Sequence, residues 1–523
     1  MNDTEVLIAG AGPTGLVLAL WLTRQGVQVR IVDKGEGPGS TSRAMAVQAR
    51  TLELYRQLNL DREVVAAGLR NPAINIWAKG RHRARLDFRD AGSRITPFPF
   101  VLIYPQDQHE RLLIRHLEEA DVQVEHRTEL LGFTDEGGRV TARVRGPDGV
   151  ETTCTADWLA GCDGAHSVVR HQLGTGFEGG TYDQVFYVAD VESEGVAANG
   201  EIHMSLENAD FVLLLSYDGA ARGRLIGAVR VEREQAGRPI GFDDVRQQAI
   251  ASLGLKVRQV NWFSTYRVHH RVTGRYRRGR VLLAGDAAHV HSPAGGQGMN
   301  TGIGDAINLA WKLAAVQRGH APQAMLDTYE AERIAFARRL VETTDRVFSA
   351  VTAQGNMADF MRLHVAPMFA SAAYAIGPVR EFMFRVLSQT GVHYHDSALS
   401  EGMAGEVRAG ERLPWIGHDG PDNHAPLNAM AWQVHVYGDP AADLDAWCGQ
   451  AGVPLEHYPW SQACYDAGLA RDAVYLVRPD GYIALADPAG APANLDRYFG
   501  TRGILPHGHR IPVPLARQPR PHI

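Results

Sequence analysis

The stretch VLLAGDAAHVHSPAGGQGMN, residues 281–300, decides the fold of this 523-residue chain. Its first residues, Val281–Ala284, are apolar and predict a short buried strand. Gly285-Asp286 ends that strand, and a glycine-rich turn leads into a helix that begins near Asn300. The helix has one apolar face, made of Ile303, Ile307, Ala310, Leu313 and Ala314. A strand, an acid, a glycine-rich turn and a helix N-terminus predict a site for a group that gathers negative charge.

A second glycine motif, GAGPTG at residues 10–15, lies near the amino terminus. It stands between a predicted strand, Glu5–Ala9, and a predicted apolar helix, Leu16–Arg24. The next predicted strand, Val29–Val32, ends at Asp33. This order of strand, glycine turn, helix, strand and acid is typical of dinucleotide-binding βαβ units, in which the acid follows the glycines by roughly 20 residues.

Each glycine of that motif has its own role in a dinucleotide site. Gly10 permits the tight turn, Gly12 lets the backbone approach the pyrophosphate, and Gly15 lets helix and strand pack closely. The acid Asp33 favours a free ribose 2′-hydroxyl, as in FAD or NAD, over the phosphorylated ribose of NADP.

Three ordered segments resemble the class A flavoprotein aromatic hydroxylases, the group with the p-hydroxybenzoate hydroxylase fold. They are GAGPTG with Asp33, GCDGAHSVVR (Gly161–Arg170) and GDAAHVHSPAGGQGMNTGIGDAINLAWKLA (Gly285–Ala314). The segments SRAMAVQARTLELYRQLNL (Ser42–Leu60) and PQDQHERLL (Pro105–Leu113) are also similar to that family. LVRPDGYIAL (Leu476–Leu485) resembles the carboxy-terminal domain of the phenol hydroxylase and polyketide hydroxylase branches. The resemblance therefore runs over nearly the whole chain.

The resemblance implies FAD as the cofactor and names the residues that would hold it. They are Gly10, Gly12, Gly15, Asp33, Arg43, Gln106, Asp163, Gly285, Asp286, Gly298, Met299 and Asn300. Arg43 would offer a cation to the pyrophosphate or ribityl region, and Asp286 would accept from ribityl hydroxyls. The amides of Gly298–Asn300, with the helix dipole behind them, would stabilise the reduced flavin ring by about 1 kcal/mol per favourable contact. One departure is His109, which stands where the family commonly has threonine.

In this family NAD(P)H reduces the flavin, and O₂ then adds to give a C4a-hydroperoxide that delivers oxygen to an electron-rich phenolic ring. The resemblance thus implies hydroxylation of a phenolic or polycyclic aromatic substrate. No second GxGxxG follows a strand, which agrees with a nicotinamide nucleotide, NADPH favoured, that binds only transiently. The alternatives are a related FAD-dependent epoxidase, Baeyer–Villiger-type enzyme or oxidase of the same fold, or a non-catalytic FAD protein that sequesters an aromatic ligand.

The sequence leaves open which residue promotes ionisation of the substrate. Tyr217 is one candidate, in register with other residues on one face of a predicted strand. Other candidates near segments that should border the cavity are His291, His203 and Tyr104. For each of these four, a structural polar group with satisfied hydrogen bonds is at least as good an interpretation. Pro293 of the glycine-rich turn is a further residue expected at the catalytic site. His289 in the GDAAH run is expected to be a structural hydrogen-bonding residue.

Composition narrows the class of protein further. With 45% hydrophobic and 21% charged residues, the chain reads as an ordinary globular protein. A net charge of −6 gives no reason to expect nucleic acid or an anionic membrane as a partner. No signal peptide or membrane-length apolar run is evident, and the four cysteines form neither a CxxC pair nor a metal-like spacing. These features predict a cytoplasmic protein without a metal site, and they leave open whether it is a monomer or a homodimer.

The predicted fold is α/β: a discontinuous Rossmann-like FAD domain, an inserted β-sheet substrate domain and a carboxy-terminal thioredoxin-like domain. All FAD motifs precede residue 315, so the last domain is expected to be dispensable for flavin binding. Without a CxxC it is expected to serve packing or dimer contact. The predicted boundaries are 1–70, 101–180 and 276–395 for the FAD domain, 71–100 and 181–275 for the inserted sheet, 396–430 for a linker and 431–523 for the last domain.

Overall fold

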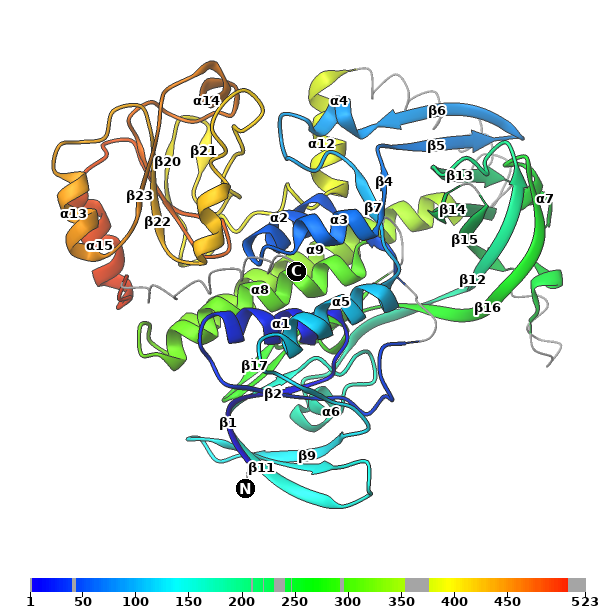
Figure 1. Ribbon diagram of the computed structural model, residues 1–523, viewed down its shortest axis with the longest axis horizontal. Helices are drawn as coiled ribbons and strands as arrows, with labels where there is room; N and C mark the ends of the chain where they lie inside the picture. Colours follow the sequence, from blue (N-terminus) through cyan, green and yellow to red (C-terminus); the bar gives the residue numbers. More distant parts are fainter. Residues whose placement is uncertain are drawn as a thin grey trace, which may run out of the picture.

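The computed structural model describes residues 2–39, 44–207, 210–219, 221–229, 240–245, 247–291, 296–352 and 376–506. Within them the chain has the predicted α/β architecture, with helices gathered at the centre and three larger sheets around them (Figure 1). The first sheet contains a parallel core, the second is almost entirely antiparallel, and the third belongs to the carboxy-terminal part of the chain.

The first sheet is built around β1 (Asn2–Ala9), which pairs in parallel with β2 (Val29–Val32) and β11 (Glu151–Gly161). β11 in turn pairs in parallel with β18 (Val281–Leu283), so the two glycine motifs begin at the same edge of one sheet. The carboxyl ends of β1 and β11 and all of β18 are apolar and buried, because both faces of the parallel sheet are covered there. The sheet also includes β8 (Val124–Glu125), β9 (Glu129–Asp135), β10 (Val140–Arg145) and β17 (Arg277–Arg278).

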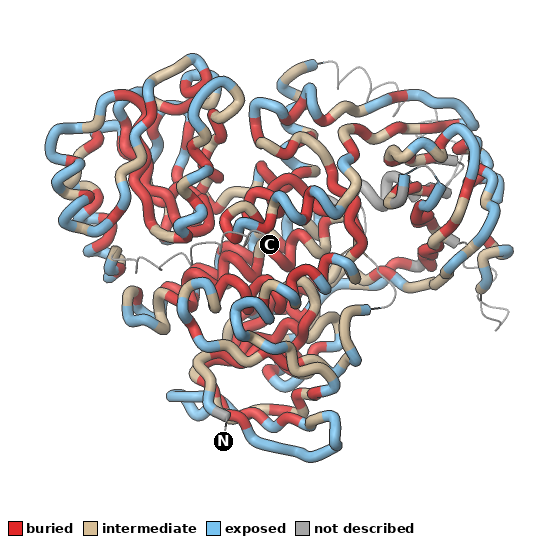
Figure 2. The backbone as a smooth tube through the Cα atoms, in the orientation of Figure 1, coloured by how far each residue is buried: buried red, intermediate tan, exposed pale blue. Residues whose placement is uncertain are grey.

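Buried helices lie beside this sheet and form the centre of the core (Figure 2). α1 (Pro13–Arg24) packs against α8 (Gly298–Gln317), which begins two residues before the predicted start. α8 also packs against the long α9 (Met325–Thr352). The other helices of this region are α2 (Ala49–Gln57), α3 (Asp61–Ala67), α5 (Gln106–Glu118), α6 (Val168–Leu173) and α12 (Gly377–Leu387).

The second sheet is organised by two long antiparallel strands, β12 (Glu178–Gly195) and β16 (Leu255–Val272). The segment that precedes residue 100 contributes two strands to this sheet, as the sequence predicted. One of them, β5 (Ala73–Ala78), pairs in parallel with β13 (Ile202–Glu207). The remaining members are β6 (Arg81–Asp87), β14 (Asp210–Asp218), β15 (Arg222–Val229) and β19 (His289–Val290). Short helical segments beside it are α4 (Phe88–Gly92), α7 (Gln247–Ala251), and the 3-10 turns η2 (Phe242–Asp244) and η3 (Gly285–Ala287).

A small three-stranded sheet joins the helices to the second sheet. It is formed by β3 (Ala46–Val47), β7 (Val101–Ile103) and β4 (Leu69–Asn71), with β7 in the middle. β4 and β7 contact β14 of the second sheet. The small sheet therefore stands at the boundary between the FAD motifs and the inserted sheet.

The carboxy-terminal sheet has a thioredoxin-like order, with β22 (Gln433–Tyr437) between the parallel β23 (Leu455–Tyr458) and the antiparallel β24 (Val474–Val477). β25 (Ile483–Asp487) follows, and the helices are α13 (Leu444–Ala451), α14 (Gln462–Asp466) and α15 (Pro492–Arg502). The prediction that 396–430 is only a linker is corrected here. β20 (Glu401–Ala404) pairs with β25 and with β21 (Val407–Arg408), because β25 offers an edge that this glycine-rich segment completes; η6 (Ala425–Ala429) follows.

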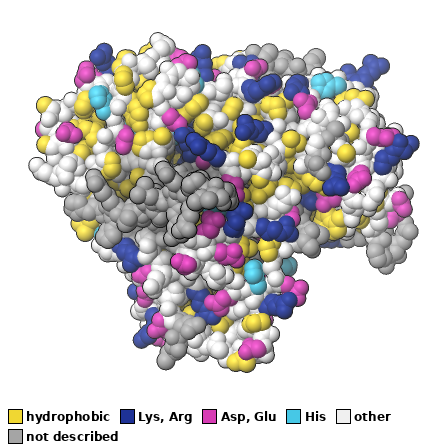
Figure 3. All heavy atoms as spheres, in the orientation of Figure 1, with side chains coloured by type: hydrophobic (Ala, Val, Ile, Leu, Met, Phe, Trp, Pro, Cys, Tyr) yellow, Lys and Arg dark blue, Asp and Glu magenta, His cyan; other side chains and the backbone are white. Residues whose placement is uncertain are grey.

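The molecular surface mixes charges of both signs on the face drawn in Figure 3. Among the described residues no helix is both long and apolar enough to cross a bilayer. Within the same residues, no three histidine, cysteine or acidic side chains are grouped so that they could hold a metal ion.

Candidate cofactor and substrate site

The two glycine motifs touch each other through Thr14, a residue of GAGPTG. A Cβ atom added to Gly285 would stand 2.5 Å from the Thr14 hydroxyl oxygen, and one added to Gly302 would be closer still. Gly285 also has a φ of +60°, a left-handed conformation that glycine adopts without strain. Glycine at these positions is therefore required for the close approach of α1 to the η3 turn and α8.

The glycines of the first motif divide as the sequence predicted between packing and open space. A Cβ on Gly10, whose φ is +103°, would collide with the backbone of Cys162, and one on Gly15 would collide with the carbonyl of Gly10. A Cβ on Gly12 would meet nothing within 4 Å. Gly12 caps the N-terminus of α1, so this helix end opens toward free space.

That free space is a cavity of about 250 Å³. It is lined by Ala9, Gly10, Gly12, Val32, Asp33, Lys34, Thr128, Glu129, Leu130, Cys162, Asp163, Gly164, His166 and Val168. The cavity thus collects the helix N-terminus and both predicted acids at one sheet edge. Positive helix ends favour a pyrophosphate, and an acid beside them accepts from ribose hydroxyls.

The two acids differ in how far their oxygens are used. Asp33 accepts from the amide of Ala11 at 2.7 Å and of Gly35 at 2.6 Å, one bond to each oxygen, which leaves further lone pairs. Asp163 accepts with Oδ2 from the amide of Val168 at 2.7 Å. Its Oδ1 is buried and has no hydrogen-bond partner among the described residues. An orphaned carboxylate oxygen in this cavity fits a dinucleotide bound against it.

The second motif forms the other half of the site. Gln297, the N-cap residue of α8, makes no side-chain hydrogen bond to the helix, so among the described residues no side chain caps the amides of Gly298 and Met299. Asn300 is buried, and its side chain accepts from the Gln48 amide at 2.9 Å and donates to the Ala46 carbonyl at 2.9 Å. Asn300 therefore fixes the start of α8 to β3 and α2 with its side chain, and only its backbone amide is left for a ligand.

Two acids of this region differ in burial. Asp286, the predicted ribityl ligand, is exposed on the η3 turn. The buried acid is Asp305 of α8, which accepts from the Gly285 amide at 3.0 Å, from His289 at 2.6 Å and from Arg333 at 2.5 Å. His289 is therefore a structural hydrogen-bonding residue, as expected.

The electrostatics of Asp305 follow from these partners. Burial alone would raise the pKa of Asp305, but Arg333 and His289 hold it below its ordinary value. The carboxylate stays ionised and ties the η3 turn to α8 and α9. Asp305 was not among the predicted site residues because a polar position on a helix is typical of a solvated face.

The remaining predicted residues fall into three groups. Arg43 and Pro293 lie outside the described residues. Gln106 donates to Glu110 at 2.8 Å and accepts from the Ala44 amide at 3.4 Å. His291 is half-buried and lies against the start of α8, 3.7 Å from where a Cβ of Gly298 would be.

Two further candidates are occupied by structural contacts. His203 is buried between Trp77 and Asn199, at 3.0 and 2.8 Å, and burial lowers its pKa to about 4. Tyr104 donates its hydroxyl to the carbonyl of Gln108 at 3.1 Å. Both side chains therefore make hydrogen bonds within the fold, which agrees with the alternative interpretation that they are structural residues.

The inserted sheet turns an aromatic face toward the helices. Tyr217 of β14 is half-buried on this face, which it shares with Trp262 and Tyr266 of β16. Residues of the opposite parity, such as Leu214 and Leu225, pack into a separate core behind the sheet. The alternation of a strand therefore places Tyr217 on the face that packs against the main core cluster, which includes the helices of the FAD domain.

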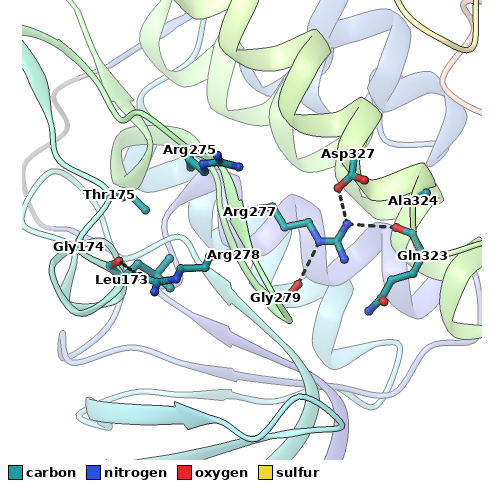
Figure 4. A pocket seen from close by; sticks show the side chains of 10 residues that line it. All are labelled: Leu173, Gly174, Thr175, Arg275, Arg277, Arg278, Gly279, Gln323, Ala324 and Asp327. Carbon is teal, nitrogen blue, oxygen red and sulfur yellow. Dashed lines mark hydrogen bonds and ion pairs between the residues drawn. The ribbon is translucent and has the colours of Figure 1, made fainter.

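A larger surface hollow, about 810 Å³, lies away from these motifs and is drawn in Figure 4. It is lined by Leu173, Gly174, Thr175, Arg275, Arg277, Arg278, Gly279, Gln323, Ala324 and Asp327. Arg277 pairs with Asp327 at 2.6 Å, and Arg278 donates to the Leu173 carbonyl at 2.8 Å. These two arginines bind β17 to neighbouring segments of the chain. None of the residues that line the hollow belongs to the FAD motifs.

The fold and the paired glycine motifs define a flavoprotein of the FAD-binding α/β class. The family model described as an FAD binding domain matches residues 3–344. The chain is 34% identical to 6-methylpretetramide 4-monooxygenase from Streptomyces rimosus, over 97% of this chain and 94% of that one. It is also 34% identical to pentachlorophenol 4-monooxygenase from Sphingobium chlorophenolicum, over 79% and 76% of the two chains.

A solved structure agrees with these relatives. The anhydrotetracycline hydroxylase OxyS from Streptomyces rimosus superposes with a TM-score of 0.75 at 27% identity, covering 97% of this chain and 100% of that one. The chain belongs to the class A flavoprotein monooxygenases, the family of the phenol-type and aromatic polyketide hydroxylases. It is a flavin-dependent aromatic monooxygenase whose cofactor is FAD.

Proposed function

We propose that this enzyme hydroxylates a phenolic or polycyclic aromatic substrate, with NAD(P)H as electron donor, NADPH favoured, and O₂ as oxygen source. FAD supplies the redox chemistry when bound, and the protein contributes binding, orientation and exclusion of water. The names of two similar proteins, 6-methylpretetramide 4-monooxygenase and anhydrotetracycline hydroxylase, support a polycyclic substrate.

The observation that carries this proposal is the aromatic face of the inserted sheet. Half-buried Tyr217 and Trp262 lie on the side of the sheet that packs toward the FAD motifs. On the same face, Arg224 pairs with Asp190 through two bonds of 2.7 Å, and its guanidinium lies 5.7 Å from the Trp262 ring. Aromatic surface with a small number of fixed polar groups suits a flat, oxygenated aromatic ligand.

The cofactor residues have distinct proposed roles. Asp33 accepts from ribose hydroxyls, and Asp163 lies beside the pyrophosphate with its unused oxygen. Asp286, exposed on its turn, accepts from ribityl hydroxyls. The amides of Gly298 and Met299 face the flavin ring. Arg43 and Gln106 keep the roles that the resemblance implies.

On the substrate side, Tyr217 is the proposed residue that helps a phenol ionise. Its hydroxyl belongs to the face that would border the aromatic ring. His291 is the second candidate, because it lies against Gly298 at the start of α8. Pro293, which lies outside the described residues, remains a predicted catalytic-site residue.

One experiment tests the function as a whole. The purified protein is loaded with FAD, and oxidation of NADPH and of NADH is measured with a panel of phenols and polyketide aromatics. We expect substrate-stimulated oxidation and a product heavier by one oxygen atom in mass spectra. No stimulation by any member of the panel would contradict a hydroxylase, and oxidation that yields only hydrogen peroxide would favour an oxidase.

A further inference from the structure

The side-chain amide of Asn71, in the small three-stranded sheet, is buried but makes no hydrogen bond to the described residues that would stabilise the fold. Asn71 is the last residue of β4 and is fully buried, at 0% exposure. Neither its Oδ1 nor its Nδ2 has a hydrogen-bond partner among the described residues. A buried amide without partners costs about 1–3 kcal/mol per unpaired group, so native proteins rarely keep one without a reason.

The strand register shows where this amide lies. In the small sheet, Asn71 stands opposite Val101, and Leu69 stands opposite Ile103, which also faces Ala46. Side chains at alternate strand positions share one face, so these five residues lie on the same face of the sheet.

That face is turned toward the turn before α8. A Cβ on Gly296 would stand 2.7 Å from the Cβ of Ala46, so the Ala46 side chain points at this turn. Ala46 and Leu69 are only partly buried. β4 also contacts β14, the strand of Tyr217. Asn71 therefore lies on the sheet face that is turned toward the proposed flavin turn, in a strand that contacts the strand of Tyr217.

We propose that Asn71 is a substrate-binding residue whose amide forms hydrogen bonds with ring oxygens of the aromatic substrate. The side chain has a donor and an acceptor next to each other, which matches a carbonyl or phenolate oxygen beside a hydroxyl group. This assignment rests on the proposed function and adds the chemical class of the ligand, a polycyclic aromatic that carries neighbouring oxygens.

The chain contains a matched control four residues away. Asn75 of β5 is 4% exposed, but its amide is fully used. It donates to Glu201 at 2.7 Å and to the Ile202 carbonyl at 3.3 Å, and it accepts from His82 at 3.1 Å. The two asparagines therefore differ in hydrogen bonding and hardly at all in burial.

The first test is the melting temperature of the FAD-loaded enzyme without substrate. Asn71→Leu, of similar size, should raise it by about 1–4 °C because an unpaired buried amide is removed. Asn75→Leu should lower it, since its partners lose their bonds. A fall or no change for Asn71→Leu would overturn the proposal, because the amide would then have a structural partner.

The second test is equilibrium dialysis of the same FAD-loaded proteins, without NAD(P)H, against 1,8-dihydroxyanthraquinone and against anthraquinone. The wild-type enzyme should prefer the hydroxylated ring by about tenfold, which corresponds to 1.4 kcal/mol. Asn71→Leu and the smaller variant Asn71→Ala should lose that preference, and Asn75→Leu should keep it. A preference unchanged in the Asn71 variants, or absent in the wild type, would overturn the proposal.

These tests separate failure of the inference from failure of the proposed function. Melting and dialysis need neither turnover nor NAD(P)H. If no aromatic stimulates NAD(P)H oxidation, the hydroxylase proposal falls, while the Asn71 result still decides whether this amide binds an oxygenated ring.

Discussion

The FAD-binding helices meet two other parts of the chain, and the two junctions differ in their polar groups. Buried ion pairs cross the first junction, whereas an amide without a partner among the described residues lies near the second. At the carboxy-terminal domain, Arg478 is completely buried and donates to Glu332 of α9 at 2.8 Å and to Asp480 at 2.6 Å. Lys312 of α8 reaches the same Glu332 at 2.8 Å. Arg50 of α2 donates to the Asp480 carbonyl at 2.7 Å. Charged groups from both sides are thus paired inside this junction.

Burial and pairing set the pKa values there. Burial alone would raise the pKa of Glu332, but Arg478 and Lys312 hold it well below its ordinary value. Burial lowers the pKa of Lys312 to about 8, against the opposing effect of Glu332. Glu332 is therefore a fixed anion that binds two cations from different parts of the chain.

The junction with the inserted sheet is different. Its face carries half-buried aromatic rings, including Tyr217 and Trp262, and the nearby Asn71 amide has no partner among the described residues. Arg50 Nε, Gln57 Oε1 and Arg412 Nε at the first junction are also buried without partners among the described residues, so the two junctions differ in their ion pairs and not in complete satisfaction of polar groups. Buried ion pairs hold the first junction together, and the second carries the proposed substrate face.

Removing the carboxy-terminal domain near residue 400 should have the largest effect. The sequence alone predicted an intact flavin spectrum, but truncation leaves Glu332 and Lys312 at a surface formerly closed by Arg478. We expect a loss of more than about 5 kcal/mol of unfolding free energy, beyond the cost of breaking one buried pair. Urea unfolding measures the loss of stability, and the flavin spectrum of the purified truncated protein measures how much FAD it retains. A soluble truncated protein with wild-type stability and full FAD would show that the domain is an independent appendage.

Arg478→Met breaks the same junction at one point. The variant leaves Glu332 and Asp480 buried with fewer partners, which should cost about 3–5 kcal/mol in urea unfolding. The control is Arg497→Met in the same domain, since the Arg497–Glu401 pair is half-exposed and should change stability by less than about 1 kcal/mol. Equal effects of the two variants would contradict the cohesive role of the buried pair.

Lys312→Met tests the pH dependence of the junction. Because the folded pKa of Lys312 is about 8 and its ordinary value is 10.5, the unfolded chain binds more protons between these pH values. Its contribution to stability should therefore rise with pH in that window, by up to about 1.4 kcal/mol per pH unit.

The measurement is unfolding free energy from pH 7.5 to 10 for wild type and variant. The variant should lack this increment, and its stability at pH 7.5 should change little because Glu332 keeps Arg478. Identical pH slopes for the two proteins would show that Lys312 does not lose its proton in the folded state.

Tyr217→Phe tests the other junction and should have the smallest effect on stability, below about 1 kcal/mol. Instead, product formed per NAD(P)H should fall and hydrogen peroxide should rise, since a hydroxyl that helps ionise the phenol is lost. The deficit should narrow at high pH, where the substrate ionises unaided. Wild-type coupling across the pH range would move the role to His291.

Much of the fold was readable from sequence because its signals are local. The GAGPTG turn, the GD turn and the apolar strands each depend on neighbouring residues, and the helix near Asn300 began within two residues of its predicted start. A left-handed glycine and a short apolar run have few alternative structures. The sequence therefore determined the dinucleotide-binding architecture and the three-part organisation.

Only the tertiary structure decided which polar residues are buried. Asp305, Asn308 and Lys312 recur at helical spacing on α8, a pattern that a sequence alone reads as a solvated stripe. They are buried because α9 and the carboxy-terminal domain bring Arg333, Glu332 and Arg478 to them.

The same reason explains the correction of the predicted linker. β20 joins β25 across more than eighty residues, so its composition alone suggested a linker. The unpaired state of Asn71 is also a tertiary property. Local sequence sets backbone conformation, while burial and pairing of charges depend on contacts between distant segments.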